Sequence, residues 1–207
     1  MNDFILLLQR TPVATQLLAM IVGASLFALY RRPELLERHL FRPYWFFRRR
    51  EFITPVTSAF LHADLAHLFF NAFTFWAFAF PLEGQIGSGK FAALYGFGLL
   101  ASTAGSYFTH RHQSGYRTLG ASGAILAVLF ASIVYIPSAS IYILPIPVPI
   151  PAPLFAFAYL AFTWWAARRG QGRINHDAHL AGALAGIAFA ALADPQALAV
   201  AVNQWLR

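Results

Sequence analysis

Six long apolar stretches run along the chain, each bounded by clusters of Arg, Pro or Gly. They fall at about 13–30, 65–83, 91–108, 119–136, 153–167 and 178–193. About 20 consecutive apolar residues suffice for an α-helix to cross the hydrocarbon core of a bilayer. The pattern therefore predicts an all-α, polytopic membrane protein, a bundle of six transmembrane helices in a single domain over residues 1–207.

The last two apolar stretches are shorter than the others. A helix of about 16 residues rises only about 24 Å. Such helices need flanking residues, local thinning of the bilayer or cover from other parts of the protein. A thinned bilayer would also bring water closer to a buried site.

The connections between the apolar stretches carry patterns of their own. The first, at about 31–64, interleaves seven arginines with aromatic residues, which predicts an amphipathic loop embedded in the headgroup region. Alternating prolines leave few backbone donors, so they predict an extended connector rather than a helix; they are Pro145, Pro147, Pro149, Pro151 and Pro153. Asp194-Pro195 resembles a helix cap followed by a first-turn proline and predicts a short last helix.

Composition supports the membrane interpretation. The chain is 58% hydrophobic and 11% charged, with a mean hydropathy of +0.56, whereas soluble domains are about 25% charged. Its net charge is +7, and nearly all of its cationic side chains are Arg. In an apolar chain such residues set topology or contact anionic headgroups, so we expect a lipid bilayer and no nucleic acid as partner. The chain has no Cys, which excludes disulfides and thiolate chemistry, and the first apolar stretch lacks a convincing cleavage site, so we expect it to be a retained anchor.

Ser122 is the first residue with catalytic potential. It lies in the run Leu119-Gly120-Ala121-Ser122-Gly123-Ala124-Ile125, at the start of an apolar stretch. A hydroxyl in a membrane helix is tolerated, but one between glycines, with polar partners in other apolar stretches, suggests chemistry rather than packing alone.

His67 and Asn71 stand four residues apart in the second apolar stretch, so a helix places both on one face. Two interpretations stay open for this pair. Its members could form hydrogen bonds to neighbouring helices, or they could donate to a developing negative charge as an oxyanion hole.

His179 opens the last apolar stretch and is followed by Gly182 and Gly186, which leave one helix face nearly bare. Small residues allow two helix backbones to approach closely, as a short hydrogen bond between Ser and His on separate helices requires. Neutral imidazole can accept the serine proton, so a dyad could suffice. Asp177 would face elsewhere on a helix, so we assign no third member, and His176 is a weaker candidate for the base.

Other polar residues have simpler explanations. Asp64 could cap the second helix, while His62 could be a surface residue or lie at the mouth of a site. His110 and His112 fit a solvated loop, and metal binding there is disfavoured. We expect neither a metal nor a cofactor.

Together these residues resemble the rhomboid family of intramembrane serine proteases. The likeness covers residues from about Thr57 to Ala193. It rests on His-x-x-x-Asn, Gly-x-Ser-Gly and Ala-His-x-x-Gly-x-x-x-Gly in the second, fourth and sixth helices. The residues that match are His67 and Asn71, then Gly120, Ser122 and Gly123, then Ala178, His179, Gly182 and Gly186.

The resemblance implies a specific chemistry. Ser122 would be the nucleophile and His179 the general base and then acid, with His67, Asn71 and the Ser122 backbone N–H as oxyanion donors. The reaction would be hydrolysis of peptide bonds in transmembrane segments of other proteins, after local unwinding, because a regular helix hides its carbonyls. The fifth helix would be a lateral gate; its aromatic residues are Phe155, Phe157, Trp164 and Trp165.

Two features depart from the family pattern. Many members carry Trp-Arg shortly before the second helix, but this register falls here near Ile53-Thr54, with shifted candidates only at Trp45 and Arg48 to Arg50. The connections on the side of the site also hold twelve arginines against three basic residues opposite. The positive-inside rule would turn the site toward the cytoplasm, whereas the family usually places it outside, the orientation that we expect.

Alternative functions stay open. A rhomboid-like protein without catalysis could bind membrane proteins or act in their quality control, although such relatives usually lack the Ser or the His. A small transporter or channel gives no reason for a Ser between glycines, and a soluble hydrolase needs a strand before its nucleophile. We expect a multi-pass protein in the cell (inner) membrane of a bacterium, with an oligomeric state that the sequence leaves open.

Overall fold

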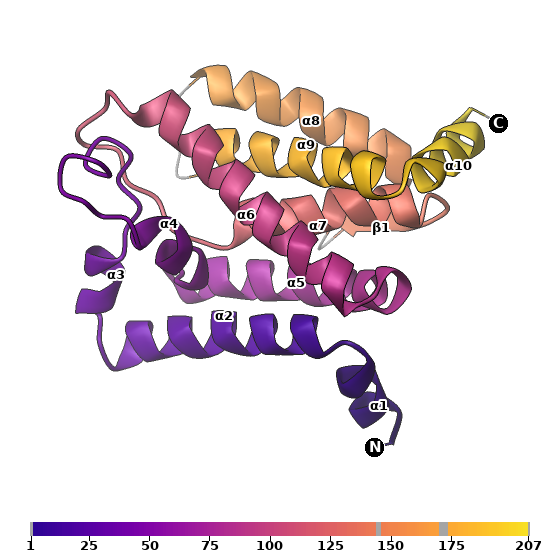
Figure 1. Ribbon diagram of the computed structural model, residues 1–207, viewed down its shortest axis with the longest axis horizontal. Coiled ribbons are helices and arrows are strands. Elements are labelled where there is room, and N and C mark those ends of the chain that lie inside the picture. Colours follow the sequence, from indigo (N-terminus) through magenta and orange to yellow (C-terminus); the bar gives the residue numbers. More distant parts are fainter. Residues whose placement is uncertain (1, 144–145, 170–173, 207) are drawn as a thin grey trace.

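The computed structural model describes residues 2–143, 146–169 and 174–206 of the chain and is mostly helical (Figure 1). The described elements are α1 (Asn2–Arg10), α2 (Pro12–Tyr30), α3 (Glu34–Arg38), α4 (Thr54–Thr57), the 3₁₀-helix η1 (Ser58–Phe60), α5 (Leu65–Ile86), α6 (Ser88–His110), α7 (Ser122–Tyr135), β1 (Ser140–Ile143), β2 (Ile146–Pro151), α8 (Ala152–Arg169), α9 (His176–Ala193) and α10 (Pro195–Trp205).

Each of the six apolar stretches forms a helix, but several ends differ from those predicted. The last two helices, α8 and α9, have 18 residues each, so they are longer than expected. The short helix is α7, with 14 residues, or about 21 Å at 1.5 Å per residue. It starts three residues late because Gly120 has a positive φ of 123°, which a right-handed helix does not accommodate. Within the described residues, three helices, α2, α5 and α9, are long and apolar enough to cross a membrane.

The short helix α7 forms the centre of the molecule. Every residue from Gly123 to Val134 is buried, and the helix packs against α5, α6 and α9. Helices α2 and α5 lie side by side along one edge of the bundle, and α8 lies along the opposite edge beyond α9 (Figure 1). Protein rather than lipid therefore surrounds α7, which explains how so short a helix is accommodated.

Glycines set the spacing between the three helices at the centre. A Cβ on Gly182 would overlap the carbonyl oxygen of Gly123, and one on Gly186 would overlap that of Ala127. On α6, a Cβ at Gly98 would overlap the side chain of Ala127. Small residues at such crossings let backbones meet directly, and this closeness brings the ends of α7 and α9 together.

The proline-rich connector is extended, as predicted, but it also pairs with a neighbouring segment. Strands β1 and β2 form an antiparallel hairpin in which Ser140 faces Pro151 and Ile141 faces Ile150. Pro145 lies outside the described residues. Pro153 falls in the first turn of α8 instead of the connector, where its missing N–H costs nothing. The predicted all-α fold therefore acquires one small sheet.

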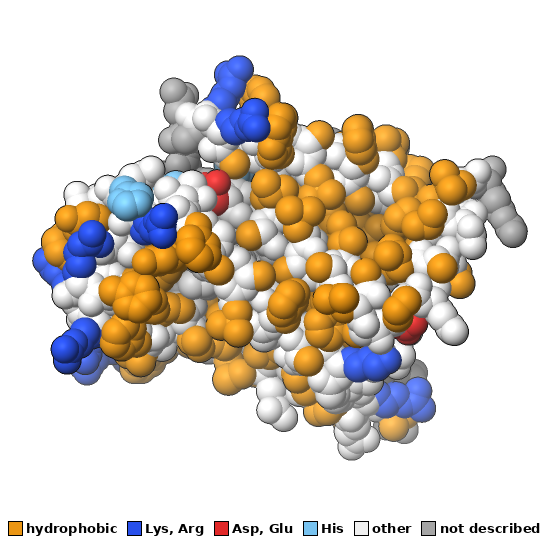
Figure 2. All heavy atoms as spheres, turned by 45° about the horizontal axis from the view of Figure 1, so that its top comes forward, with side chains coloured by type: hydrophobic (Ala, Val, Ile, Leu, Met, Phe, Trp, Pro, Cys, Tyr) orange, Lys and Arg blue, Asp and Glu red, His pale blue; other side chains and the backbone are white. Residues whose placement is uncertain are grey.

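A band of apolar side chains covers the middle of the surface, with Lys and Arg gathered toward its two ends (Figure 2). In the first connection Phe47 and Phe52 are exposed, and the guanidinium groups of Arg48 and Arg49 lie 4.0 and 3.9 Å above the rings of Tyr44 and Trp45. Arginine stacked on aromatic rings suits a headgroup region. These contacts agree with the amphipathic loop that the sequence predicts.

Glu83 joins the start of α2 to the end of α5. Its buried carboxylate accepts hydrogen bonds from the backbone N–H groups of Val13 and Ala14 at 3.0 and 2.6 Å and from the Ser88 hydroxyl at 2.6 Å. Thr11, the residue before α2, makes no capping bond with its side chain. A carboxylate from another helix therefore satisfies the free donors at this helix end.

We expect Glu83→Ala to lower the free energy of unfolding by about 3 kcal/mol, because it leaves one buried and one partly buried N–H group without an acceptor. Thermal denaturation in detergent micelles measures this. Gln85→Ala, two residues away, is the control: it removes one exposed hydrogen bond, to the Tyr135 carbonyl, and should cost less. Equal melting temperatures for the two variants would contradict the assignment of Glu83 as a structural cap.

Candidate active site

Ser122 and His179 lie in direct contact. The Ser122 Oγ is 2.7 Å from the His179 Nε2, although 57 residues separate them. Ser122 is the first residue of α7 and His179 lies in the first turn of α9. The close approach of Gly123 and Gly182 brings these two helix ends within hydrogen-bond reach.

The turn before Ser122 depends on Gly120. Its φ of 123° belongs to the region that favours glycine. A Cβ there would also lie 2.8 Å from the Cε1 atom of His67, so the imidazole of His67 lies directly against this turn. The Gly120 N–H donates to the Ser58 carbonyl at 2.9 Å, which ties the turn to η1.

His62 also helps to hold this turn in place. It is fully buried, so the interpretation of His62 as a surface residue was wrong. Its Nε2 accepts from the Ala121 N–H at 3.4 Å, and its Nδ1 lies 2.9 Å from the hydroxyl of Ser25, which donates to the Phe60 carbonyl at 3.0 Å. Burial, together with the nearby His67, lowers the pKa of His62 to about 3. The neutral ring therefore donates at Nδ1 and accepts at Nε2.

His67 and Asn71 line the same region from α5. Asp64 caps this helix by accepting from the His67 N–H at 2.8 Å, as predicted. The Asn71 side chain is buried and donates from Nδ2 to the His67 carbonyl at 2.9 Å. An amide NH₂ carries two hydrogens, so this bond uses only one of the two donors of Asn71.

The second nitrogen of His179 has a partner that the sequence did not reveal. The Tyr159 hydroxyl, from α8, lies 3.1 Å from His179 Nδ1. His176, the weaker candidate for the base, stacks edge to face on His179 with ring centroids 6.2 Å apart. Its Nδ1 is buried without a hydrogen-bond partner among the described residues.

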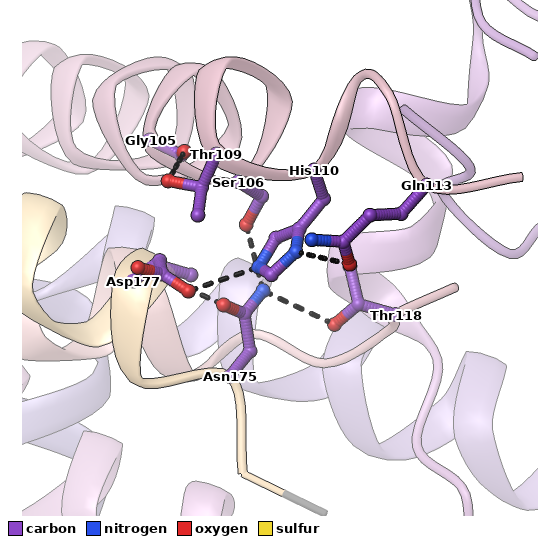
Figure 3. A network of polar contacts seen from close by, with 9 residues as sticks. Gly105, Ser106, Thr109, His110, Gln113, Thr118, Asn175 and Asp177 are labelled. Atoms are coloured by element: carbon purple, nitrogen blue, oxygen red, sulfur yellow. Dashed lines mark hydrogen bonds and ion pairs between the residues drawn. The ribbon is translucent and has the colours of Figure 1, made fainter. Parts of the chain in front are cut away.

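A separate polar network fixes the start of α9 (Figure 3). Asn175 accepts from the Ala178 N–H at 3.0 Å and donates to the Ser106 hydroxyl on α6 at 2.6 Å. The Asp177 carboxylate lies 2.9 Å from His110 Nε2, at the end of α6. His110 is therefore not a solvated loop residue as expected: it ends α6.

Tyr116 completes this network. Its ring stacks on His110 with centroids 3.6 Å apart, and burial, followed by the charge of Asp177, raises the pKa of the Tyr116 hydroxyl. The Asp177 carboxylate contacts His110 on α6. Asp177 and His110 hold α9 against α6 and so position the helix that carries His179.

These residues open onto a cavity of about 1070 Å³. Its lining contains Ser122, His179, His67 and Asn71, and it extends to Ser106, Thr118 and Asn175. A cavity with several hydroxyl, amide and imidazole groups can hold water inside an otherwise apolar bundle. All four candidate residues thus line one cavity.

The first connection is held near this cavity by contacts that replace the expected Trp-Arg register. Phe41 pairs with Thr118 through backbone hydrogen bonds of 2.9 and 3.0 Å, and Trp45 Nε1 donates to the Ser114 carbonyl at 3.1 Å. Arg42 and Glu51 form an ion pair at 2.7 Å within the connection. The shifted candidate Trp45 therefore anchors the loop to the segment that leads to Ser122.

Comparison with known proteins places this arrangement in context. A family model described as a Rhomboid domain matches residues 49–195. The chain is similar to presenilin-associated rhomboid-like protein A, mitochondrial, of Danio rerio, with 35% identity over 136 residues, which are 64% of this chain and 35% of that protein. It is also similar to rhomboid protein 1, mitochondrial, of Saccharomyces cerevisiae, with 26% identity over 183 residues, or 81% of this chain and 50% of the relative.

A bacterial protein matches over a shorter region. The rhomboid protease GluP of Bacillus subtilis is 38% identical over 80 residues, which are 38% of this chain and 14% of that protein. The chain thus spans half the length or less of these three relatives. The mitochondrial proteins of fish and yeast contradict our expectation of a bacterial cell membrane. Hydrophobicity identifies a membrane protein but carries no information on which membrane holds it, so that expectation was wrong.

Proposed function

Because the chain belongs to the rhomboid family, we propose that it is a serine endopeptidase that hydrolyses peptide bonds in or near transmembrane segments of other membrane proteins. The observation that carries the proposal is the 2.7 Å contact between Ser122 Oγ and His179 Nε2, two residues that line a cavity with several polar groups. A relative named as a rhomboid protease supports it.

Ser122 and His179 would act as a dyad. The Oγ attacks the substrate carbonyl while its proton passes to Nε2, and His179 then gives this proton to the leaving amide nitrogen. Water from the cavity attacks the acyl-enzyme next, with the same imidazole as base. The neutral ring needed for the first step requires a proton on Nδ1, which is where Tyr159 lies.

The negative charge that develops on the carbonyl oxygen would lie at the N-terminus of α7. The first hydrogen bond of this helix runs from Ile125 to the Ala121 carbonyl, so the N–H groups of Ser122 and its next two neighbours have no intrahelical acceptor. The helix dipole favours negative charge at this place. The imidazole of His67 and the remaining donor of Asn71 complete the proposed oxyanion hole.

The bundle would give substrates access from the lipid. We propose that α6, α7 and α8 join the three apolar helices α2, α5 and α9 in a six-helix membrane domain. Helix α8 lies at an edge of this bundle and exposes Phe157 to 75%, with Trp164 and Trp165 about half exposed. It is the helix that we propose as a lateral gate for transmembrane protein substrates. The names of the relatives favour a mitochondrial membrane as the location.

Covalent labelling by a fluorophosphonate reagent tests this proposal and separates it from the alternative of a non-catalytic binding or quality-control protein. We expect the purified protein in detergent to be labelled, because the reagent reacts only with an activated serine. Ser122→Ala should abolish the label, whereas Ser114→Ala, in the exposed loop before the site, should retain it. Complete inertness of the folded protein would favour the binding function.

A further inference from the structure

We propose that Tyr159 is a positioning residue for the general base and that it couples the place of α8 to the orientation of the His179 ring. This inference rests on the proposed function. Tyr159 lies on a third helix, α8, and its hydroxyl reaches the imidazole of His179.

The contacts of His179 show why a third residue matters. One ring nitrogen, Nε2, lies 2.7 Å from Ser122 Oγ, and the other, Nδ1, lies 3.1 Å from Tyr159 Oη. An imidazole held at one nitrogen alone can still turn about its side-chain bonds. Contacts at both nitrogens, on opposite sides of the ring, define its plane and its direction.

The place of Tyr159 is itself fixed by packing. Its ring lies 5.5 Å from that of Phe155, nearly parallel, and 5.7 Å from that of the fully buried Phe130 on α7. Aromatic contacts of this kind hold a ring with little freedom to rotate. While α8 is packed against α7, the phenol oxygen therefore has a defined position against which His179 is aligned.

The contact also accommodates the productive tautomer. A base that takes the proton of Ser122 on Nε2 must carry its own proton on Nδ1. The oxygen of Tyr159 can accept from that Nδ1–H before and after Nε2 is protonated. In many serine hydrolases a carboxylate does this, but here Asp177 is bound to His110 instead. A neutral phenol orients the ring without a full negative charge.

The position of Tyr159 on α8 has a mechanical consequence. Ser122 and His179 are held by the tight crossing of α7 and α9, whereas α8 lies at the edge of the bundle. A substrate that enters by moving α8 would shift the phenol relative to His179. The base would then be aligned fully only when α8 packs back against α7 and α9.

The test compares Tyr159→Phe with Tyr95→Phe. The first keeps the packed ring and removes the hydroxyl on His179; the second removes a buried hydroxyl that has no hydrogen-bond partner among the described residues. We expect Tyr159→Phe to lower kcat roughly tenfold to a hundredfold, less than loss of a triad carboxylate, with KM unchanged within about twofold. The control should change neither.

The rate of fluorophosphonate labelling separates positioning from substrate entry, because the small reagent needs no movement of α8. A parallel fall in labelling rate, with an unchanged melting temperature, would support the proposal. Normal labelling with reduced cleavage would assign Tyr159 to substrate entry and overturn it, as would normal values of both. A wild-type protein that neither labels nor cleaves would overturn the proposed function itself.

Discussion

Replacement of His179 by alanine should reduce cleavage of a membrane-anchored substrate by about four to six orders of magnitude while the protein stays folded. The reason is that the hydroxyl of Ser122 is a poor nucleophile unless a base removes its proton, and Nε2 of His179 is the group at 2.7 Å. Ser122→Ala should cause a loss of similar size, and the double variant should be no worse than either, because the two residues act as one unit.

The measurement is the cleavage of a panel of single-span membrane proteins by the protein reconstituted in proteoliposomes. His176→Ala is the matched control: it removes an imidazole three residues earlier on the same helix and should leave the rate within a few fold. Thermal denaturation checks that each variant is folded. A His179→Ala variant with more than a hundredth of the original rate would refute the proposed dyad.

The long helices could be predicted from the sequence because burial in lipid demands long apolar runs. Their ends could not be placed as well, since single residues decide them. Gly120 delays the start of α7 through its positive φ, and Asn175 caps α9 before the apolar run begins. Neither effect changes the hydrophobic pattern, so a pattern based on hydrophobicity alone places both ends incorrectly.

The candidate site was predictable to the extent that its residues follow local spacing. His67 and Asn71 share a helix face, and the glycines after His179 signal a close crossing. The roles of Tyr159 and Glu83 could not be predicted, because each side chain contacts a different helix and no local spacing indicates such a contact. The hydroxyl of Tyr159 within an apolar stretch could have indicated a polar contact. Because other aromatic residues surround it in the sequence, it looked like one more packing residue. Glu83, an acidic residue at the end of an apolar run, resembled an ordinary surface charge.

Among single substitutions of glycine by alanine at the centre of the molecule, we expect Gly182→Ala to lower stability and activity the most. The added Cβ would overlap the carbonyl oxygen of Gly123, so α9 must move away from α7. Overpacking of this kind costs about 3 kcal/mol of unfolding free energy. The same movement separates the first turns of the two helices, where Ser122 and His179 need hydrogen-bond contact, and a displacement of about 1 Å costs about a hundredfold in rate.

Gly96→Ala on α6 makes the same chemical change, but we expect it to raise stability instead of lowering it. A Cβ at Gly96 has no neighbour within 4 Å, so alanine should stabilise this helix by about 0.5–1 kcal/mol and leave cleavage unchanged. Melting temperatures and cleavage rates of the two variants should therefore move apart. If Gly182→Ala kept the stability and activity of the original chain, α7 and α9 would not need to meet through glycine. The short Ser122 to His179 distance would then have to come from the flanking network of Asn175 and Asp177 instead.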